Sequence, residues 1–524
     1  MRQKAAQTGG GQFMAYLMGI DLGTSSLKTM IIREDGQVVC VSAQNYQFAS
    51  PFSGYAEHDP AEWWDACVAT IRKDLADSGV DPAEIKGVSF SGQMHGLVML
   101  DKDKNVIRPA ILHCDARSGE EVLRIRGQFG ARQGELMMNP VYSGFLFVSL
   151  LWVKEHEPEN YARIRYVCLP KDYLKFRLTG EITSEYSDAS ATLAFDVKNV
   201  RWSEEILSEF GISPALFPPL FNTADAVGTV CAAAAAETGL SEKTLVIAGG
   251  GDQVMQGIGN GVTKAGGASV NIGTSGQVSF QSDTPIFNPA LSTNTFCGYK
   301  KGRWITMGAI MNAGLCLKWV NRLLGQTDYR ALNEAVSRVL PGSGGVVFLP
   351  YLNGERTPHL NPDLSGEFVG VNLGTGPAEL TRAVMEGVAY ALNQCIELCG
   401  DLGLRANDYI VASGGGARSG PWLQIQADIF NYPLKVAETE EQACLGACIA
   451  AGAGAGIYRD IDEGCMRTVR YKDFTVIPDE KAHRIYEEYY QLFKDIYVSG
   501  HRELNKVTLL GRLVDRESKS NLHI

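Results

Sequence analysis

Strand-like runs of residues flank a tight polar corner at two places in the chain. The first pair of runs covers residues 17–20 and 27–32, and the second covers 268–270 and 277–280. Short runs of apolar and β-branched residues bounded by Gly, Ser and Thr predict buried β-strands. The repeated arrangement therefore predicts a hairpin at the start of each half of the chain.

More elements follow the first hairpin. An Asp-Gly turn at 34–37 leads to a third strand at 38–42, because Asp-Gly supplies the positive φ angles of a tight hairpin. The pair Asp59-Pro60 opens a helix, since Pro is favoured at the first helical position. Apolar residues recur there at helical spacing: Trp63, Trp64, Cys67, Val68 and Ile71. Strands at 87–90 and 97–100 then complete a βββαβ pattern.

The second half repeats this order less regularly. The long helix ends where Gly403 follows it, and the last helix is rich in small residues that allow close packing. The expected strands are 303–307, 346–349 and 409–412, and the expected helices are 312–324, 377–402, 421–430 and 443–456. These elements predict an α/β fold built from two related domains.

Chain length supports two domains. The 524 residues are too many for one compact core, and domains of roughly 250 residues are expected. We divide the chain into an N-terminal domain at 14–262 and a C-terminal domain at 263–500. Residues 1–13 are expected to be a disordered extension, and residues 501–524 a charged and loosely held tail.

Charge and composition narrow the class of protein. A net charge of −11 argues against a nucleic-acid or acidic-membrane surface. No apolar run reaches the roughly 20 residues of a membrane span, and residues 1–12 lack the apolar region of a secretory signal. Most of the twelve cysteines lie in apolar stretches, which indicates reduced core thiols in a cytoplasmic protein.

The two corners have similar sequences. The first is Asp21-Leu22-Gly23-Thr24-Ser25 and the second is Asn271-Ile272-Gly273-Thr274-Ser275. Backbone N–H groups and hydroxyls at such a corner can hold phosphate, so the pair predicts a polyphosphate gripped between the two halves. A carboxylate repels phosphate, and Asp21 is therefore expected to hold Mg²⁺ that bridges the nucleotide phosphates.

A strand at 246–248 runs into three glycines and Asp252. A carboxylate at the lip of a glycine loop is placed to accept the proton of an attacking hydroxyl, as a general base does. The alternative is that Asp252 is only the N-cap of the following helix.

Two further loops carry candidate binding residues. Gln93, Met94 and His95 follow a buried strand, where polar groups can bind a polyol while Met94 packs against its apolar face. The loop at 413–419 contains Gly414, Gly415 and Gly416, and a flat glycine surface suits a purine ring or sugar. Its contiguous glycines do not match the dinucleotide-binding fingerprint.

These motifs, in this order, resemble the FGGY carbohydrate kinase family, in the superfamily of actin, hexokinase and the large heat-shock chaperones. The resemblance covers residues 16–456, and the segment 366–386 looks like the C-terminal signature of that family. Within the family, four segments are most similar to xylulokinases: 92–96, 169–174, 249–252 and 351–359.

The resemblance implies two RNase H-like domains of βββαβαβα type with a cleft between them. It implies ATP and Mg²⁺ as cofactors, Asp252 as catalytic base, Asp21 as the catalytic carboxylate on the metal side, and Gln93, Met94, His95 and Asp252 around the sugar. It places the following residues at the nucleotide: Thr24, Ser25, Gly273, Thr274, Gly314, Lys318, Gly415, Gly416 and Ser419. The expected reaction is phosphorylation of D-xylulose to D-xylulose 5-phosphate.

Two departures from xylulokinases leave the sugar open. This chain has His113-Cys114-Asp115 where a Trp-Asn-Asp-like stretch is usual. It has Leu146-Phe147-Val148-Ser149 where Thr-Ala-Pro-Lys is usual. Another ketose or a sugar alcohol is the alternative substrate, and an actin-like or chaperone-like nucleotide-driven protein is the alternative class. A homodimer is also left open.

Overall fold

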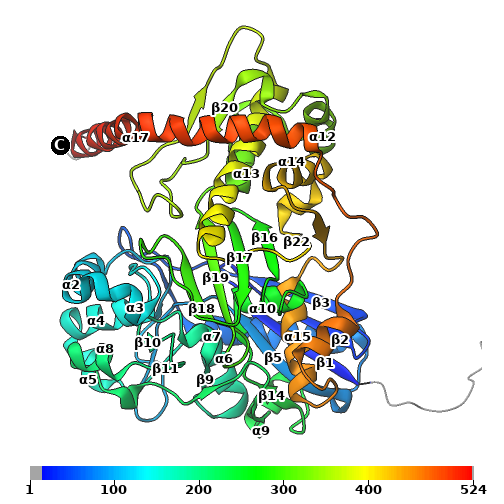
Figure 1. The fold of residues 1–524 in the computed structure, drawn as a ribbon. Coiled ribbons are helices and arrows are strands. Elements are labelled where there is room, and N and C mark those ends of the chain that lie inside the picture. The colour runs from blue at the N-terminus through cyan, green and yellow to red at the C-terminus, as the bar shows by residue number, and fades with distance from the viewer. Residues whose placement is uncertain (1–14, 522–524) are drawn as a thin grey trace, which may run out of the picture.

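The computed structural model describes residues 15–521, with the side chains of residue 504 and of 511–521 left out of the description. The extension predicted at 1–13 lies outside the described residues. Two α/β halves stack on each other in Figure 1, and each is built around a mixed sheet.

The N-terminal sheet has the strand order β13-β14-β5-β1-β2-β3. Strand β2 runs antiparallel to both β1 and β3, whereas β5 runs parallel to β1 and β14 runs parallel to β5. The bounds are β1 Tyr16–Leu22, β2 Ser26–Arg33, β3 Val38–Asn45, β5 Ile85–Gly92, β13 Ala226–Thr229 and β14 Leu245–Ile247. A short strand, β15 (Gly250–Gly251), also pairs with β5.

The C-terminal sheet repeats this topology in the order β18-β19-β17-β16-β22-β23. Its hairpin strands are antiparallel, and β22 and β23 continue parallel to β16. The bounds are β16 Ala268–Ile272, β17 Gly276–Ser282, β18 Asn294–Cys297, β19 Trp304–Ile310, β22 Ile410–Ser413 and β23 Leu434–Val436. The two sheets confirm the predicted duplication, with the two polar corners at equivalent hairpins.

Helices complete the βββαβαβα order of each half. In the first half they are α1 Pro60–Ser78, α6 Pro170–Thr179 and α10 Asp252–Gly259, and in the second they are α13 Pro377–Asp401, α14 Gly420–Phe430 and α15 Gln442–Gly454. The helix α11 (Gly314–Leu323) is inserted after β19. Asp59 caps α1 by accepting a hydrogen bond from Ala61 N, with Pro60 at the first helical position as predicted.

Two predicted strands lie outside these sheets. The strand expected at 97–100 is β6 (Val98–Leu100), which pairs with β8 (Tyr166–Cys168), and β20 (Val347–Leu349) pairs with β21 (Glu367–Val369). The departure at β6 has a local cause, because His95 has a φ of 75° and turns the chain off the sheet.

The small-residue helix α15 belongs in sequence to the second half but packs on the first. In Figure 1 it lies beside strands β1 and β2, and it also contacts β5 and α10. A Cβ at Gly446 would lie 2.0 Å from the carbonyl oxygen of Met255, so only glycine allows α15 and α10 to approach this closely. The domain boundary at 262 stays a prediction. Helix α15 follows this boundary in the sequence but packs against elements that precede it.

The C-terminal residues continue a helix. Helix α17 (Glu480–Asn521) packs its first turns on the second half through Tyr486 and Phe493, which are 1% and 0% exposed. It then extends beyond the body of the molecule (Figure 1), where Val507 and Leu510 are exposed. The predicted tail at 501–524 is therefore helical up to Asn521, and its loose attachment stays a prediction.

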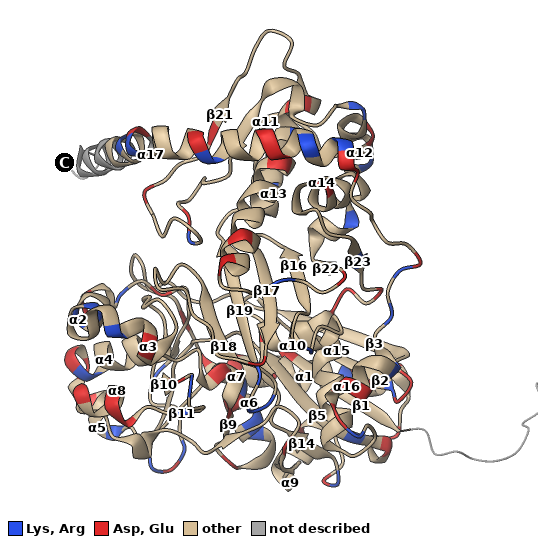
Figure 2. Cartoon of the chain, in the orientation of Figure 1, with Lys and Arg blue, Asp and Glu red and all other residues tan. Residues whose placement is uncertain are grey.

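Cysteine chemistry agrees with the sequence. All twelve cysteines are free and nine of them are buried, which confirms the expected core thiols. Charged side chains of both signs are interspersed over the two halves (Figure 2). None of the helices within residues 15–521 is long and apolar enough to cross a membrane.

Candidate active site

One cavity of about 360 Å³ contains residues from both halves of the molecule. It brings together Thr24 of the first corner, Ser275 of the second, and the predicted sugar residues Gln93, Met94 and His95 with Asp252. The remaining lining residues are Gly23, His113, Tyr142, Phe145, Gln253, Gln277, Asn294, Phe296, Met307, Ala309, Met311 and Arg356. Residues far apart in sequence thus face one space at the junction of the two sheets.

Asp252 is the first residue of α10, and Gly251 is the N-cap of that helix. The alternative that Asp252 serves as the N-cap is therefore wrong. Burial raises the pKa of Asp252 to about 7, the nearby charge of Asp21 adds to the shift, and hydrogen bonds from Gln253 oppose it. A carboxylate whose pKa lies near neutrality is suited to accept a proton at physiological pH.

His95 presents a defined face to the cavity. Its Nδ1 lies 2.7 Å from the carbonyl oxygen of Ala191, and a carbonyl can only accept, so Nδ1 carries the proton. Burial lowers the pKa of His95 to about 3, which keeps the ring neutral and leaves Nε2 as an acceptor. The ring stacks on Phe145 with centroids 3.9 Å apart, and this contact fixes its orientation.

Gln93 links the strand end to the first corner. The hydroxyl of Thr24 donates to Gln93 Oε1 at 3.2 Å, and Gln93 Nε2 donates to the carbonyl oxygen of Gly23 at 3.4 Å. Met94 is 5% exposed and packs against Gly251 beside the predicted base. The turn at Gln93–Met94 therefore contacts both the first corner and the glycine loop that precedes Asp252.

Asp21 lies on β1 opposite Lys28 of β2. Burial raises the pKa of Asp21, while a hydrogen bond from Ser91 and the charge of Lys28 act in the opposite direction. Lys28, to which the sequence assigned no role, donates to Glu441 Oε2 at 2.6 Å. The charge of Asp21 contributes to the raised pKa of Asp252, so these two carboxyl groups lie near each other.

The second corner is docked on the start of α11. Gly314 N donates to the carbonyl oxygen of Gly273 at 2.9 Å, and a Cβ at Gly314 would lie 2.4 Å from that oxygen. The carbonyl oxygen of Thr274 accepts from Ala313 N at 3.0 Å. These bonds explain why glycine is needed at position 314. The hydroxyl-bearing side chains of Ser25 and Thr274 are exposed.

The remaining predicted nucleotide residues are dispersed. Gly415 lines a second cavity of about 200 Å³ together with Lys28, Arg418, Glu441 and Lys472. Gly416 is buried against Ile272, and Ser419 caps α14 and donates to Asn333 Oδ1 at 2.8 Å. Lys318 is exposed on α11 and lines neither cavity.

The two sequence departures differ in position. His113 lines the 360 Å³ cavity, and its Nδ1 is buried without a hydrogen-bond partner. Residues Leu146–Ser149 open helix α4 (Leu146–His156), are at most 1% exposed, and do not line the cavity. Of the two departures, only the one at His113 therefore lines this cavity.

Sequence reasoning missed several lining residues. Asn294 and Phe296 come from β18 and Arg356 from the loop after β20, all in the half assigned to the nucleotide. An edge strand carries no sign in its sequence that it will face the opposite half. Arg356 lies within the xylulokinase-like segment 351–359, which was the one available signal.

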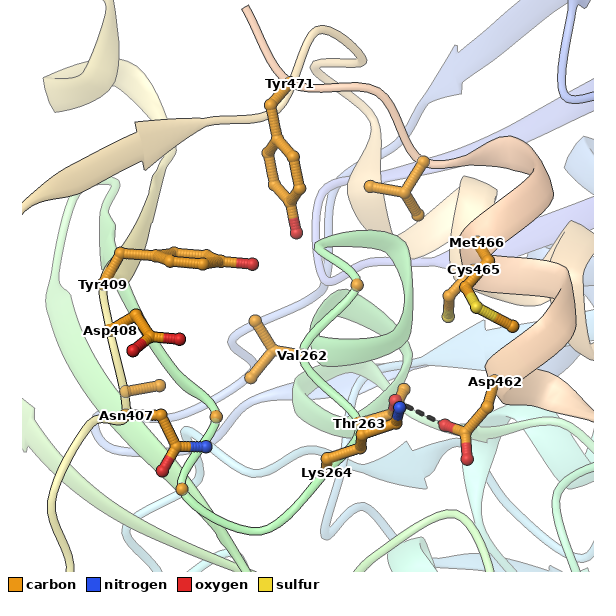
Figure 3. Close-up of a pocket in the computed structure, with 15 residues that line it drawn as sticks. Val262, Thr263, Lys264, Asn407, Asp408, Tyr409, Asp462, Cys465, Met466 and Tyr471 are labelled. Carbon is orange, nitrogen blue, oxygen red and sulfur yellow. Dashed lines mark hydrogen bonds between the residues drawn. The ribbon is translucent and has the colours of Figure 1, made fainter. Parts of the chain in front are cut away.

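A larger cavity of about 450 Å³ lies at the segment that joins the halves (Figure 3). Tyr409 and Tyr471 extend into it, and Thr263 donates to Asp462 at 2.6 Å. Ala268, at the start of β16, lines this cavity, whereas the second corner lies at the other end of that strand. None of the predicted site residues lines it.

Comparison with known proteins decides the family. Residues 16–259 match the N-terminal domain of the FGGY family of carbohydrate kinases, and residues 268–455 match its C-terminal domain. The chain belongs to the FGGY family of carbohydrate kinases. It is therefore an ATP-using carbohydrate kinase, and the actin-like and chaperone-like alternatives are not favoured.

Individual members of the FGGY family are similar to this chain over nearly its full length. The xylulose kinase of Bacillus subtilis is 36% identical over 485 residues, covering 92% of this chain and 97% of that protein. The xylulose kinase of Staphylococcus epidermidis is 36% identical over 492 residues, with 92% and 96% covered. A crystal structure described as a xyloylose kinase from Brucella ovis has a TM-score of 0.87 at 33% identity, covering 93% of this chain and 99% of that one. The two-domain FGGY fold implied by the sequence is confirmed.

Proposed function

We propose that this protein transfers the γ-phosphoryl group of ATP to D-xylulose, giving D-xylulose 5-phosphate and ADP. The observation that carries the proposal is the single cavity in which Asp252, the Gln93–His95 turn and both corners meet. The names of the full-length relatives, which are xylulose kinases, support D-xylulose as the sugar.

Asp252 acts as the general base in this proposal. Its carboxylate accepts the proton of the sugar hydroxyl as the hydroxyl oxygen bonds to the γ-phosphorus, and the bond to the β–γ bridging oxygen breaks. His95 Nε2 accepts a hydrogen bond from another hydroxyl, and Met94 packs against the apolar face of the sugar. These contacts orient the attacking oxygen.

The two corners hold the phosphates. Backbone N–H groups and the hydroxyls of Ser25, Thr274 and Ser275 donate to phosphoryl oxygens, and Gly314 fixes the second corner. Thr24 contributes its backbone N–H, because its hydroxyl donates to Gln93 Oε1. In this proposal Gly415, Gly416 and Ser419 border the adenosine, and Lys318 lies near the nucleotide. Closure of the halves excludes water, so that the sugar outcompetes hydrolysis.

Asp21 is the proposed Mg²⁺ residue. Its carboxylate lies near that of Asp252, and the hard oxygen ligands fit a magnesium ion, directly or through water. Bound Mg²⁺ would reduce the negative charge of the phosphates that the hydroxyl must approach. A cytoplasmic location and a homodimer stay predictions.

Comparing sugars with ATP in a coupled assay tests the substrate. We expect D-xylulose to give the highest kcat/KM, with L-xylulose, D-ribulose, D-fructose, D-psicose, xylitol and erythritol at least about tenfold lower, because the buried polar groups of a site penalise a misplaced hydroxyl. If another sugar exceeded D-xylulose, the kinase chemistry would stand and the substrate assignment would fall.

One observation favours another ketose as the second candidate. His113 lines the cavity where xylulokinases usually carry Trp, and burial lowers its pKa to about 4, which leaves a neutral ring. The ring therefore brings to the cavity wall a hydrogen-bonding group of a different kind from an indole, while its Nδ1 is buried without a partner among the described residues. The same sugar comparison separates the two candidates.

The pH dependence of the reaction follows from Asp252. A base must be deprotonated to act, and its pKa of about 7 means that activity rises with pH through neutrality. We expect kcat/KM for D-xylulose to increase about tenfold from pH 6 to pH 8, as a single ionisation gives. A profile that is flat over this range, measured with coupling enzymes in excess at each pH, would contradict the assignment.

A further inference from the structure

Five ionisable side chains are fully buried beneath the candidate active site. They are Lys171, Asp172 and Lys175 of α6, Glu185 of β9 (Ser184–Glu185) and Asp188 of α7 (Tyr186–Ala189), each 0% exposed. Lys171 Nζ lies 2.8 Å from Asp172, 3.2 Å from Asp188 and 3.3 Å from Glu185. Lys175 Nζ lies 2.9 Å from Asp172. We call these five residues the buried charge cluster; Figure 2 shows α6 and α7 in the first half.

Stability alone does not account for this cluster. Burying charges is costly, and well-packed apolar residues at such positions are often equally or more stable. Two lysines face three carboxylates, and burial raises the pKa of Asp188 to about 8, so that its protonation balances the charge at neutral pH. Each of the five groups lies within 3.3 Å of a group of opposite charge, and these ion pairs tie α6, β9 and α7 together.

The buried charge cluster holds both ends of the glycine loop that precedes Asp252. Lys175 Nζ donates to the carbonyl oxygen of Ala248 at 3.2 Å. Gly251 N donates to Ser187 Oγ at 3.0 Å. Ser187 is itself fixed by Glu185, whose carboxylate accepts from Ser187 N at 2.6 Å. The loop is thus anchored just before its glycines, at Ala248, and at the last of them, Gly251.

The elements that carry the buried charge cluster also contact the turn at residues 92–95. Lys171 packs directly against Gly92, where a Cβ would lie 2.6 Å from Lys171 Cβ. Ala191, whose carbonyl oxygen binds His95 Nδ1, donates its own N–H to the carbonyl oxygen of Asp188 at 3.0 Å. The linked elements α6, β9 and α7 therefore contact both the glycine loop before Asp252 and the turn that carries Met94 and His95.

We propose that Lys175 and Ser187 are positioning residues that set the place of the Asp252 carboxylate relative to the sugar. This inference rests on the proposed role of Asp252 as base. Three consecutive glycines have high conformational freedom and no side chains with which to fix themselves. Backbone bonds hold part of this loop, since Gly250 and Gly251 pair with β5 and Gly249 N donates to the carbonyl oxygen of Thr223 at 3.1 Å. The side chains of Lys175 and Ser187 add anchors at Ala248 and at Gly251, next to Asp252.

The test compares Ser187→Ala with Ser190→Ala. Ser190 is the matched control, since its hydroxyl is equally buried at the end of the same helix, donates to Ser187 O at 2.6 Å and accepts from Cys297 N at 2.9 Å without touching the glycine loop. With D-xylulose and ATP, we expect Ser187→Ala to lower kcat about tenfold or more, because small misplacements of a reacting group are costly. The KM of Ser187→Ala for D-xylulose should stay within about twofold, and the midpoint of its pH–rate profile should move. Ser190→Ala should change neither kcat nor this midpoint.

Lys175→Met provides a second measurement. If it folds, its kcat should fall similarly, and the double variant with Ser187→Ala should lose less than the product of the two, since both act through one loop. Equal kcat and pH profiles for Ser187→Ala and Ser190→Ala would overturn the positioning role, even if Lys175→Met failed to fold. Full activity in Asp252→Asn would instead overturn the proposed role of Asp252 as general base.

Discussion

Asp252→Asn lowers kcat for D-xylulose phosphorylation by about 10³-fold, within the range that general-base catalysis supplies. The amide has nearly the same shape as the carboxylate, so sugar and ATP still bind, but it cannot take the proton of the attacking hydroxyl. The pKa of about 7 at Asp252 indicates that the carboxylate alternates between protonation states near working pH. Initial rates over a range of sugar and ATP concentrations measure the loss.

Asp408→Asn is the control for this variant. Asp408 is exposed and lines the cavity of Figure 3, away from the proposed base, so its kcat should be unchanged. Without sugar, ATP hydrolysis should be slow in the original protein, in Asp252→Asn and in Asp408→Asn. Stimulation of ATP turnover by D-xylulose should disappear only in Asp252→Asn. Activity of Asp252→Asn within a few-fold of the original protein would show that another group takes the proton.

Asp21→Asn has the second largest expected effect, a loss of about 10²-fold in kcat with a higher Mg²⁺ requirement, because one metal-side carboxylate is removed. It also changes the pH profile. The negative charge of Asp21 raises the pKa of Asp252, so its removal lowers that pKa and moves the acid limb of kcat/KM to lower pH. A Mg²⁺ titration at several pH values measures both effects.

The Mg²⁺ requirement and the pH profile of Asp21→Asn test two separate claims. An unchanged Mg²⁺ requirement would remove Asp21 from the metal site while leaving its electrostatic effect intact. An acid limb that stayed in place, or moved to higher pH, would show that the two carboxylates do not interact in the working enzyme. Asp408→Asn again serves as the control, with both properties unchanged.

Much of the fold could be predicted because its signals are local. Short apolar runs, the Asp-Gly turn and Asp59-Pro60 each act over a few residues, and each predicted element occurs within a few residues of its expected bounds. The corners were recognisable since both use the same residue types at equivalent hairpins. Asp252, Met94 and His95 were found for the same reason, as polar or flexible residues that directly follow buried strands.

The rest depends on contacts between distant segments. Phe296 and Arg356 line the 360 Å³ cavity only because the second half packs over the first. The substitutions at 146–149 suggested a changed sugar contact, yet these residues are buried within α4, where packing and not recognition determines their type. The glycines before Asp252 seemed to be needed for a ligand, while their anchoring by Ser187 and Lys175 depends on helices some 60 to 80 residues earlier in the chain.

Helix α15 has a consequence for how this protein is made. Strands β1 and β5 leave the ribosome long before residues 442–454, which cover them only after the entire second sheet has been synthesised. At ~5–20 residues per second, roughly tens of seconds separate the two events. The nascent first half therefore carries an uncovered apolar sheet face throughout that interval, until a segment translated late covers the strands that were translated first.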